Sequence, residues 1–453
     1  MNLTPARALA LKALAEIRSR DAWAHSVLDN MLRDSDLSTS DRALATRLVY
    51  GTVQTMGTLD EALNRFIPRP GGVQPPVRDA MRVAAWELLF GEADPHAAVH
   101  QGVEAVARST PYAKGFANAV LRKLADASPD FPWGDPAIDD VALARAYGHP
   151  DWLVTRLLEE YDREAVIGIL AANNSAAPLY VAHNPFKGEL DALMDSLEQD
   201  GAAPQTAPVQ GSILCANAAR AVRGEAVAAG RCLVVDAAAQ LVAQLASTSN
   251  EGMVVDLAAG RGTKTALIQA ASGGTTPLLA VDVHEFKTAI LLKRMNELEV
   301  PHVSVVTADA TDTDALLEVM GGPVADVVLI DAPCSGLGAL RRTPEKRWTI
   351  DPGVLSSLAV LGSKLLLTAA RLVRPGGVVV YSTCTILGIE NREVVGGFLV
   401  SEEGSRFQRV TLTESVPEVW EGFVGEDGDF QSLPAEGGPD GHYAAVLRAA
   451  QSD

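Results

Sequence analysis

Apolar residues recur every three or four positions through the first 125 residues, which is the spacing of one face of an α-helix. Residues 4–20 begin with a Thr–Pro pair suited to a helix start and place Leu11, Leu14 and Ile17 on one side. The pattern returns at residues 40–67, 77–90 and 114–126. The N-terminal part of the chain therefore predicts an all-α domain, which we place at residues 1–128.

The pattern becomes mixed after a connector rich in Pro and Asp at residues 128–140. Residues 151–173 have helical spacing, whereas residues 178–184 and 211–216 are short β-type runs. We interpret residues 145–235 as a separate middle domain.

Short β-branched runs and helical stretches alternate from about residue 250 onward. The strands are expected at residues 253–260, 277–283, 302–309, 325–333 and 377–384, with helices at 263–271, 285–299, 313–320 and 355–373. Continuous apolar strands with crossover helices predict a parallel, doubly wound α/β sheet, here at residues 236–453. Ligands of such sheets bind at the carboxyl ends of the strands.

Polar residues stand at those strand ends. The five strands end in or near Asp256, Asp282, Asp309, Asp331 and Cys384, and Cys334 follows Asp331 closely. Because the carboxyl ends of parallel strands share one edge of a sheet, we expect Cys334 and Cys384 to meet there. A carboxylate after the second strand, Asp282, suits the vicinal hydroxyls of a ribose. The turn with Gly260 and Gly262 allows a close approach of backbone to ligand.

Composition limits what the chain can be. At 453 residues and 47% hydrophobic content, it is long enough for two or three folded domains. No apolar run approaches the roughly 20 residues that cross a membrane, so we expect a cytoplasmic protein without a membrane partner. Its four cysteines lack the spacings of a disulfide scaffold or a metal site. No metal is expected, and thiol chemistry stays open.

The net charge of −19 opposes phosphate binding by the molecule as a whole. Residues 341–348, RRTPEKRW, form a local basic group within this acidic background. The candidates for contact with RNA phosphate are Arg341, Arg342, Lys346 and Arg347, with Trp348 available to stack on a base. The alternative is a solvated surface loop with Trp348 in the core.

Two motifs carry a family resemblance. Residues 331–338 read DAPCSGLG, and residues 381–386 read YSTCTI with Glu390 and Asn391 following. Residues 117–124 and 236–245 are similar to further segments of the same family. Together they resemble the RsmB (Sun/Fmu) family of bacterial 16S ribosomal RNA cytosine-5 methyltransferases, whose N-terminal domain is similar to the antitermination factor NusB. The resemblance covers most of the chain.

This resemblance implies a multidomain protein. Residues 1–128 would be a NusB-like RNA-binding domain, residues 145–235 a middle RNA-binding or linker domain, and residues 236–453 a Rossmann-like class I methyltransferase domain that uses S-adenosyl-L-methionine. The family's glycine turn usually reads CAAPGGKT, whereas residues 258–265 read AAGRGTKT here. The cofactor-binding residues expected are Ala258, Ala259, Gly260, Arg261, Gly262, Thr263, Lys264, Asp282, Asp309 and Asp331.

Carbon 5 of cytosine becomes a nucleophile only after a thiolate has added to carbon 6. In the resembled family the Cys of the TC motif makes this addition and the Cys of the PC motif assists release. The resemblance therefore implies Cys384 as nucleophile and Cys334 as release residue, with Asp331 stabilising charge at N3. DNA enzymes use the PC cysteine as nucleophile and lack the other one, so two cysteines favour RNA.

The resemblance also implies 16S ribosomal RNA as the substrate of a monomeric enzyme, with transfer RNA as the alternative substrate. Two other classes stay open, namely an RNA-binding assembly factor with an inactive methyltransferase domain and a nicotinamide-dependent dehydrogenase. The intact acids and thiols disfavour the first. The lack of a GxGxxG turn disfavours the second.

Overall fold

The computed structural model describes residues 3–20, 22–247 and 252–451. By their internal contacts they form two units. The helical unit consists of Met1–Ser175 and Leu340–Ile350, and the α/β unit consists of Ala176–Ala339 and Asp351–Asp453. The chain therefore passes between the units after Ser175, after Ala339 and after Ile350.

This division differs from the expected boundaries in two places. Residues 145–175 continue the helical unit, so the expected middle domain at 145–235 is shared between the two units. Residues 340–350, expected inside the methyltransferase domain, return to the helical unit. The reason for this return lies in the contacts of Arg347, described below.

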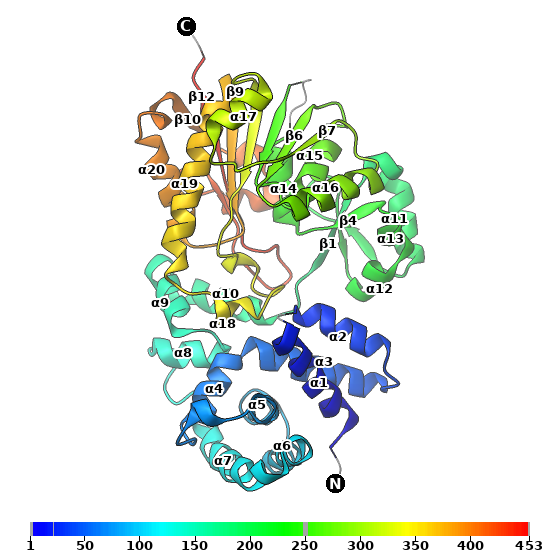
Figure 1. Ribbon diagram of the computed structural model, residues 1–453, viewed down its shortest axis with the longest axis vertical. Coiled ribbons are helices and arrows are strands. Elements are labelled where there is room, and N and C mark those ends of the chain that lie inside the picture. Colours follow the sequence, from blue (N-terminus) through cyan, green and yellow to red (C-terminus); the bar gives the residue numbers. More distant parts are fainter. Residues whose placement is uncertain (1–2, 21, 248–251, 452–453) are drawn as a thin grey trace. The chain divides into compact units, whose positions relative to one another are not determined.

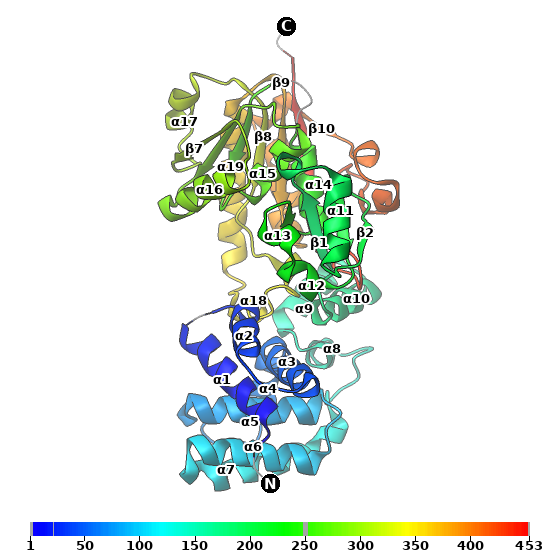
Figure 2. The ribbon, with the colours of Figure 1, turned by 90° about the vertical axis from the view of Figure 1, so that its right-hand side faces the viewer.

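The helical unit is built from α-helices joined by short turns (Figures 1 and 2). They are α1 (Pro5–Arg20), α2 (Ala24–Arg33), α3 (Thr39–Gln54), α4 (Met56–Asn64), α5 (Pro75–Leu89), α6 (Pro95–Ser109), α7 (Lys114–Ala127), α8 (Asp140–Tyr147), α9 (Asp151–Glu160), α10 (Arg163–Asn174) and α18 (Lys346–Thr349). The side chains of Ser38 and Asp94 accept hydrogen bonds from the first turns of α3 and α6. The all-α prediction for the N-terminal part is confirmed.

Helices α5, α6 and α7 lie side by side around one apolar core (Figure 2). Met81, Leu121 and Leu124 are fully buried there. Helix α6 lies outside the expected helical segments, because its interior contains Gly102 and three valines, which are poor helix formers, and its other apolar residues are small alanines. Gly102 is needed for packing, since a Cβ there would come within 2.5 Å of Ala84.

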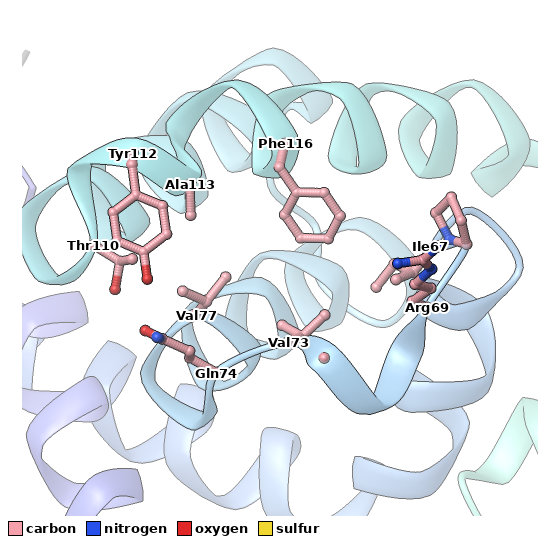
Figure 3. Close-up of a pocket in the computed structure, with 11 residues that line it drawn as sticks. Ile67, Arg69, Val73, Gln74, Val77, Thr110, Tyr112, Ala113 and Phe116 are labelled. Carbon is pink, nitrogen blue, oxygen red and sulfur yellow. The ribbon is translucent and has the colours of Figure 1, made fainter.

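A cavity of about 470 Å³ opens in the helical unit (Figure 3). Val73, Val77 and Phe116 form its apolar wall, and Arg69 and Tyr112 stand at its edge. None of the strand-end acids or thiols lines it.

The α/β unit begins with a small antiparallel sheet in the order β2-β3-β1-β4. Its elements are β1 (Leu179–His183), α11 (Leu190–Gln199), β2 (Pro204–Thr206), β3 (Ser212–Cys215), α12 (Ala218–Arg223), α13 (Glu225–Ala228) and β4 (Cys232–Val234). Cys215 and Cys232 pack in its core with Leu193 and Leu197. Burial raises the pKa of Cys215 to about 11 and that of Cys232 to about 12, so both behave as small apolar side chains.

The large sheet has eight strands, with β10-β12-β9-β8-β5-β6-β7 in order and β11 paired to β12 (Figure 1). They are β5 (Val254–Leu257), β6 (Leu278–Asp282), β7 (Val303–Thr307), β8 (Ala325–Asp331), β9 (Val373–Thr383), β10 (Phe407–Val410), β11 (Phe430–Gln431) and β12 (Tyr443–Ala449). The five expected strands, β5 to β9, pair in parallel. The predicted parallel, doubly wound sheet is confirmed for these five strands, and β12, which was not predicted, extends it by pairing antiparallel with β9.

Helices cover both faces of this sheet. Leu241, Leu267 and Leu291 of α14 (Ala237–Leu245), α15 (Thr263–Ala271) and α16 (Glu285–Glu297) share one apolar core. Helices α17 (Thr313–Met320), α19 (Val354–Leu372) and α20 (Arg392–Leu399) contribute to the other core. Helix α19 is long and apolar enough to cross a membrane by composition. Its residues Leu365, Leu366 and Ala369 instead pack in the core of the sheet.

Truncating a core leucine tests the packing of the helical unit. Leu121→Ala should lower the free energy of unfolding of this unit by about 2–5 kcal/mol, because the surrounding helices cannot close the void. Urea unfolding followed by circular dichroism measures the effect. Ile138→Ala, at a position 81% exposed, is the control and should leave the transition almost unchanged. Equal effects of the two changes would contradict the packing described here.

Candidate active site

The carboxyl ends of β8 and β9 bring two thiols together. These strands pair in parallel with Asp331 opposite Ser382. Cys334 follows β8 and Cys384 follows β9, and their Sγ atoms are 3.4 Å apart. Both side chains are partly exposed. The prediction that the two cysteines meet at one edge of the sheet is confirmed.

Lys264, in the first turn of α15, supplies a positive charge to this edge. Its Nζ lies 2.7 Å from Oδ2 of Asp331, and the hydroxyl of Ser382 donates to Oδ1 of Asp331 at 3.2 Å. Burial by itself lowers the pKa of Lys264, but the Asp331 carboxylate and then Cys384 offset this, and the net pKa is raised. An ammonium group therefore stands beside the cysteine pair.

The two thiols share a hydrogen bond in which either sulfur can be the donor. The hydrogen bond to Cys384, together with burial, raises the pKa of Cys334 well above that of a free thiol. The backbone N–H of Cys384 donates to Cys334 Sγ at 3.4 Å and lowers this pKa in part, but the net pKa stays raised. The raised pKa favours the protonated form of Cys334, which can donate to Cys384.

Buried side chains hold the loops that carry the thiols. The carboxylate of Glu390 accepts from the backbone N–H of Ser335 at 2.7 Å and from its hydroxyl at 2.6 Å. Burial raises the pKa of Glu390. The hydroxyl of Tyr381 donates to the Glu390 carbonyl at 2.7 Å. Glu390 therefore connects the residue after Cys334 to the strand before Cys384.

Asn391 fixes the second thiol loop. It accepts from the Thr383 hydroxyl at 2.6 Å and donates to the Thr385 carbonyl at 3.0 Å, so it holds both neighbours of Cys384. In the sequence, Glu390 and Asn391 belong to a motif, but no role is predicted for them. Their position next to the YSTC motif is the signal that points to them.

The turn between β5 and α15 contains three residues with left-handed backbone conformations. Ala258, Gly260 and Gly262 have φ values of 62°, 61° and 78°. A Cβ on Gly262 would come within 2.7 Å of Leu291. Arg261 is exposed, and the Thr263 hydroxyl accepts from Arg294 at 2.7 Å. Gly262 is therefore required by both conformation and packing.

Two expected ligand carboxylates already accept backbone hydrogen bonds. Asp282 accepts from the N–H of Gly260 at 3.0 Å and from that of His284 at 2.9 Å. Asp309 accepts from the N–H and the hydroxyl of Thr311, which lowers its pKa. Asp282 thus ties the second strand end to the glycine turn.

Asp256 lies completely buried beneath the turn. The hydroxyl of Thr265 donates to its Oδ2 at 2.7 Å, while Oδ1 has no hydrogen-bond partner among the described residues. Burial raises the pKa of Asp256 to about 7. The carboxyl group can therefore hold a proton near neutral pH.

The basic segment expected to contact RNA belongs to the helical unit. Arg341 is 5% exposed and Arg347 is fully buried, so the expectation that their guanidinium groups meet RNA phosphate is wrong in this structure. Trp348 donates its Nε1–H to the Gln54 carbonyl at 2.9 Å. Arg342 and Lys346 are partly exposed and remain candidates. Two of the four basic side chains are therefore buried, and Arg347 packs among helices of this unit.

The fold and the strand-end site are those of an α/β methyltransferase. The family described as 16S rRNA methyltransferase RsmB/F matches residues 242–448. The NusB family matches residues 4–126, and an RsmF/B-like ferredoxin-like domain matches residues 149–223.

Relatives similar over the whole length identify the family. The chain is 30% identical to the probable ribosomal RNA small subunit methyltransferase B of Bacillus subtilis, over 99% of both chains. It is 32% identical to a putative methyltransferase of Mycobacterium tuberculosis, over 98% of this chain and 97% of the other. The chain therefore belongs to the RsmB/Sun family of RNA methyltransferases, with a NusB-like N-terminal domain, as its motifs predict.

Solved structures share the fold. The crystal structure of PH0851 matches 98% of this chain and 99% of its own, with a TM-score of 0.80 and 22% identity. The structure of NSun6 from Pyrococcus horikoshii with SFG matches 66% of this chain and 97% of its own, with a TM-score of 0.56 and 17% identity.

The buried Asp256 should make stability depend on pH. Its folded-state pKa of about 7 exceeds the unfolded value of about 3.8, so the stabilisation is present below pH 4 and is lost as pH rises to 7. The total loss amounts to a few kcal/mol, or about 4 at most. Asp256→Asn cannot titrate but still accepts from Thr265. Its stability relative to the unchanged protein should rise between pH 4 and 7 in urea unfolding, and a constant difference would contradict the assignment.

Proposed function

We propose that this protein forms 5-methylcytosine in 16S ribosomal RNA, in the cytoplasm, with S-adenosyl-L-methionine as methyl donor. The observation that carries the proposal is the pair of thiols 3.4 Å apart beside the Lys264–Asp331 ion pair. Membership of the RsmB/Sun family supports RNA as the substrate, and relatives named ribosomal RNA small subunit methyltransferase B support 16S RNA.

The end of β5 fits the proposed cofactor. A Cβ on Gly260 would meet nothing closer than 4.0 Å, so the turn leaves open space for a ligand. Asp282 follows the neighbouring strand and retains lone pairs for the ribose hydroxyls, and Asp309 would lie toward the adenine. Bound there, S-adenosylmethionine supplies an electrophilic methyl group on a sulfonium.

Attack begins at Cys384. Lys264 and the Cys334 thiol stabilise its thiolate, which adds to carbon 6 of cytosine and forms a C–S bond. The electrons of the C5=C6 bond move toward carbon 5 and N3. Asp331 lies beside N3 and passes a proton of the Lys264 ammonium to it, which offsets the negative charge there. Carbon 5 then bonds to the methyl group, and the electrons of the broken methyl–sulfur bond remain on the sulfur of the donor.

Release reverses the thiol addition. After transfer, carbon 5 carries a methyl group and a hydrogen, and a base removes that proton. The C–H electrons restore the C5=C6 bond, and the C6–S electrons leave with Cys384 Sγ. Cys334 lies within hydrogen-bond distance of this departing sulfur and donates its S–H to it. Cys334 therefore assists release, and when it is absent the Lys264 ammonium still stabilises the attacking thiolate.

The division of labour between the thiols predicts opposite phenotypes. Cys384→Ala should abolish both methylation and any covalent link to RNA. Cys334→Ala should still attack and transfer, but its leaving thiolate lacks the S–H donor, so a protein–RNA adduct should accumulate. Denaturing gel electrophoresis with labelled 16S RNA measures the adduct, and bisulfite sequencing identifies the methylated cytosine.

Cys215→Ala is the matched control, since this thiol is buried in the small sheet. It should methylate normally and leave no stable adduct. Accumulation of an adduct by Cys384→Ala instead would reverse the two roles, and no adduct in either variant would leave both thiols without a covalent function.

Cofactor affinity tests the strand-end acids. Asp282→Ala should weaken S-adenosylmethionine binding by about 1–3 kcal/mol, because ribose hydroxyls and the Gly260 N–H lose their acceptor. Isothermal titration calorimetry measures the change. Asp314→Ala, at an exposed position on α17, is the control. Unchanged affinity in Asp282→Ala would remove Asp282 from the cofactor site.

A further inference from the structure

The segment Leu340–Ile350 begins six residues after Cys334 but packs in the helical unit. Only residues 335–339 separate it from the proposed release residue. Its short helix α18 lies beside α10 (Figure 1). We call Leu340–Ile350 the docking segment.

Arg347 of the docking segment joins the C-terminal ends of three helices. Its Nη1 donates to the carbonyls of Gln54 at the end of α3 (3.3 Å) and of Gly148 after α8 (3.1 Å). At the end of α10 it reaches the Asn174 side chain at 2.9 Å, and Nη2 donates to the Asn173 carbonyl at 3.0 Å. Helix C-termini leave carbonyls without intrahelical partners and carry partial negative charge. The guanidinium of Arg347 thus donates a hydrogen bond at each of the three helix ends.

These four acceptors are neutral groups, so the cation is balanced by helix ends and an amide oxygen. Burial lowers the pKa of Arg347 to about 9, which still leaves it charged at neutral pH. A buried cation that loses its partners is strongly unfavourable. The three helix ends and the guanidinium therefore hold one another in a single arrangement.

Neighbouring side chains add to this attachment. Trp348 donates to the same Gln54 carbonyl and lies so close to Gly57 of α4 that a Cβ there would come within 2.2 Å of its ring. Glu345 accepts from the N–H of Ala24 at the start of α2 at 2.9 Å. The docking segment thus contacts elements from both ends of the helical unit's sequence.

We propose that the helical unit positions the Cys334 loop for RNA methylation by holding the docking segment, with Arg347 as the positioning residue. Within the α/β unit, the Glu390 hydrogen bonds hold Ser335, and within the helical unit, Arg347 holds the segment that follows residues 335–339. The inference uses the loop's role in the proposed function. It does not depend on which RNA atom receives the methyl group.

Two substitutions should release the docking segment, one within the segment and one in a helix that it contacts. Arg347→Met removes the three-helix contact, and Gly57→Ala displaces Trp348 while leaving the segment's sequence intact. Gly168→Ala is the matched control, because it makes the same change within a helix of this unit where a Cβ meets nothing within 4 Å. Leu121→Ala controls for loss of stability alone.

The first readout is tryptic cleavage within the docking segment, after Arg342 or Lys346, followed by mass spectrometry on the full chain. Both release variants should be cut at least about 10-fold faster than the unchanged protein, because local opening exposes the segment. Gly168→Ala should be cut at the unchanged rate, and Leu121→Ala more slowly than either release variant. Unchanged resistance in Gly57→Ala and Arg347→Met would overturn the proposal.

The second readout is methyl transfer from S-adenosylmethionine to bulk RNA, normalised to the stoichiometry of cofactor binding so that unfolded protein is not counted. The release variants should lose about 10- to 100-fold in kcat with KM and cofactor affinity almost unchanged, as expected from a misplaced catalytic loop. Faster cleavage with unchanged kcat would overturn the positioning role. Neither readout requires the covalent adduct between Cys384 and RNA. A failure of the proposed cytosine mechanism would therefore be detected separately, by the adduct experiment.

Discussion

The parallel pairing of β8 with β9 is the constraint on which the site depends. With Asp331 opposite Ser382, the first residues beyond each strand must share one edge, and the two sulfur atoms come within hydrogen-bond distance. A shift of one residue in this pairing would turn the strand-end side chains to the opposite face. The buried cores on both faces of the sheet oppose such a shift, so the chemistry of the thiols rests on the packing of apolar residues remote from them.

The sequence predicts the central strands well because they are buried on both faces and read as uninterrupted apolar runs. It does not predict β12, although Tyr443–Ala449 is apolar, because nothing local shows that this run turns back antiparallel on β9. Strands such as Phe430–Gln431 are too short to leave a pattern. Helix α6 is missed because its apolar residues are small and its interior contains Gly102, which serves close packing rather than helix propensity.

The thiol pair is likewise predictable, since residue type and strand-end position suffice to place it. Arg347 shows the limit of the same reasoning. A run of basic residues usually marks a solvated surface, and only the folded structure reveals three helix ends that converge on one guanidinium. Glu390 and Asn391 hold loops whose paths depend on the complete sheet. Their position in the sequence therefore indicates that they matter but does not predict which groups they contact.

The antiparallel position of β12 has a consequence for the order in which the protein is assembled. While the ribosome synthesises the chain, β9 has one unpaired edge until residues 443–449 emerge, about sixty residues after Cys384. An open edge of this kind can pair with a foreign strand. A nascent chain interrupted before β12 would therefore carry both cysteines and expose the unpaired edge of β9 beside them. Strand β12 thus protects the protein against association with other chains, in addition to extending the sheet.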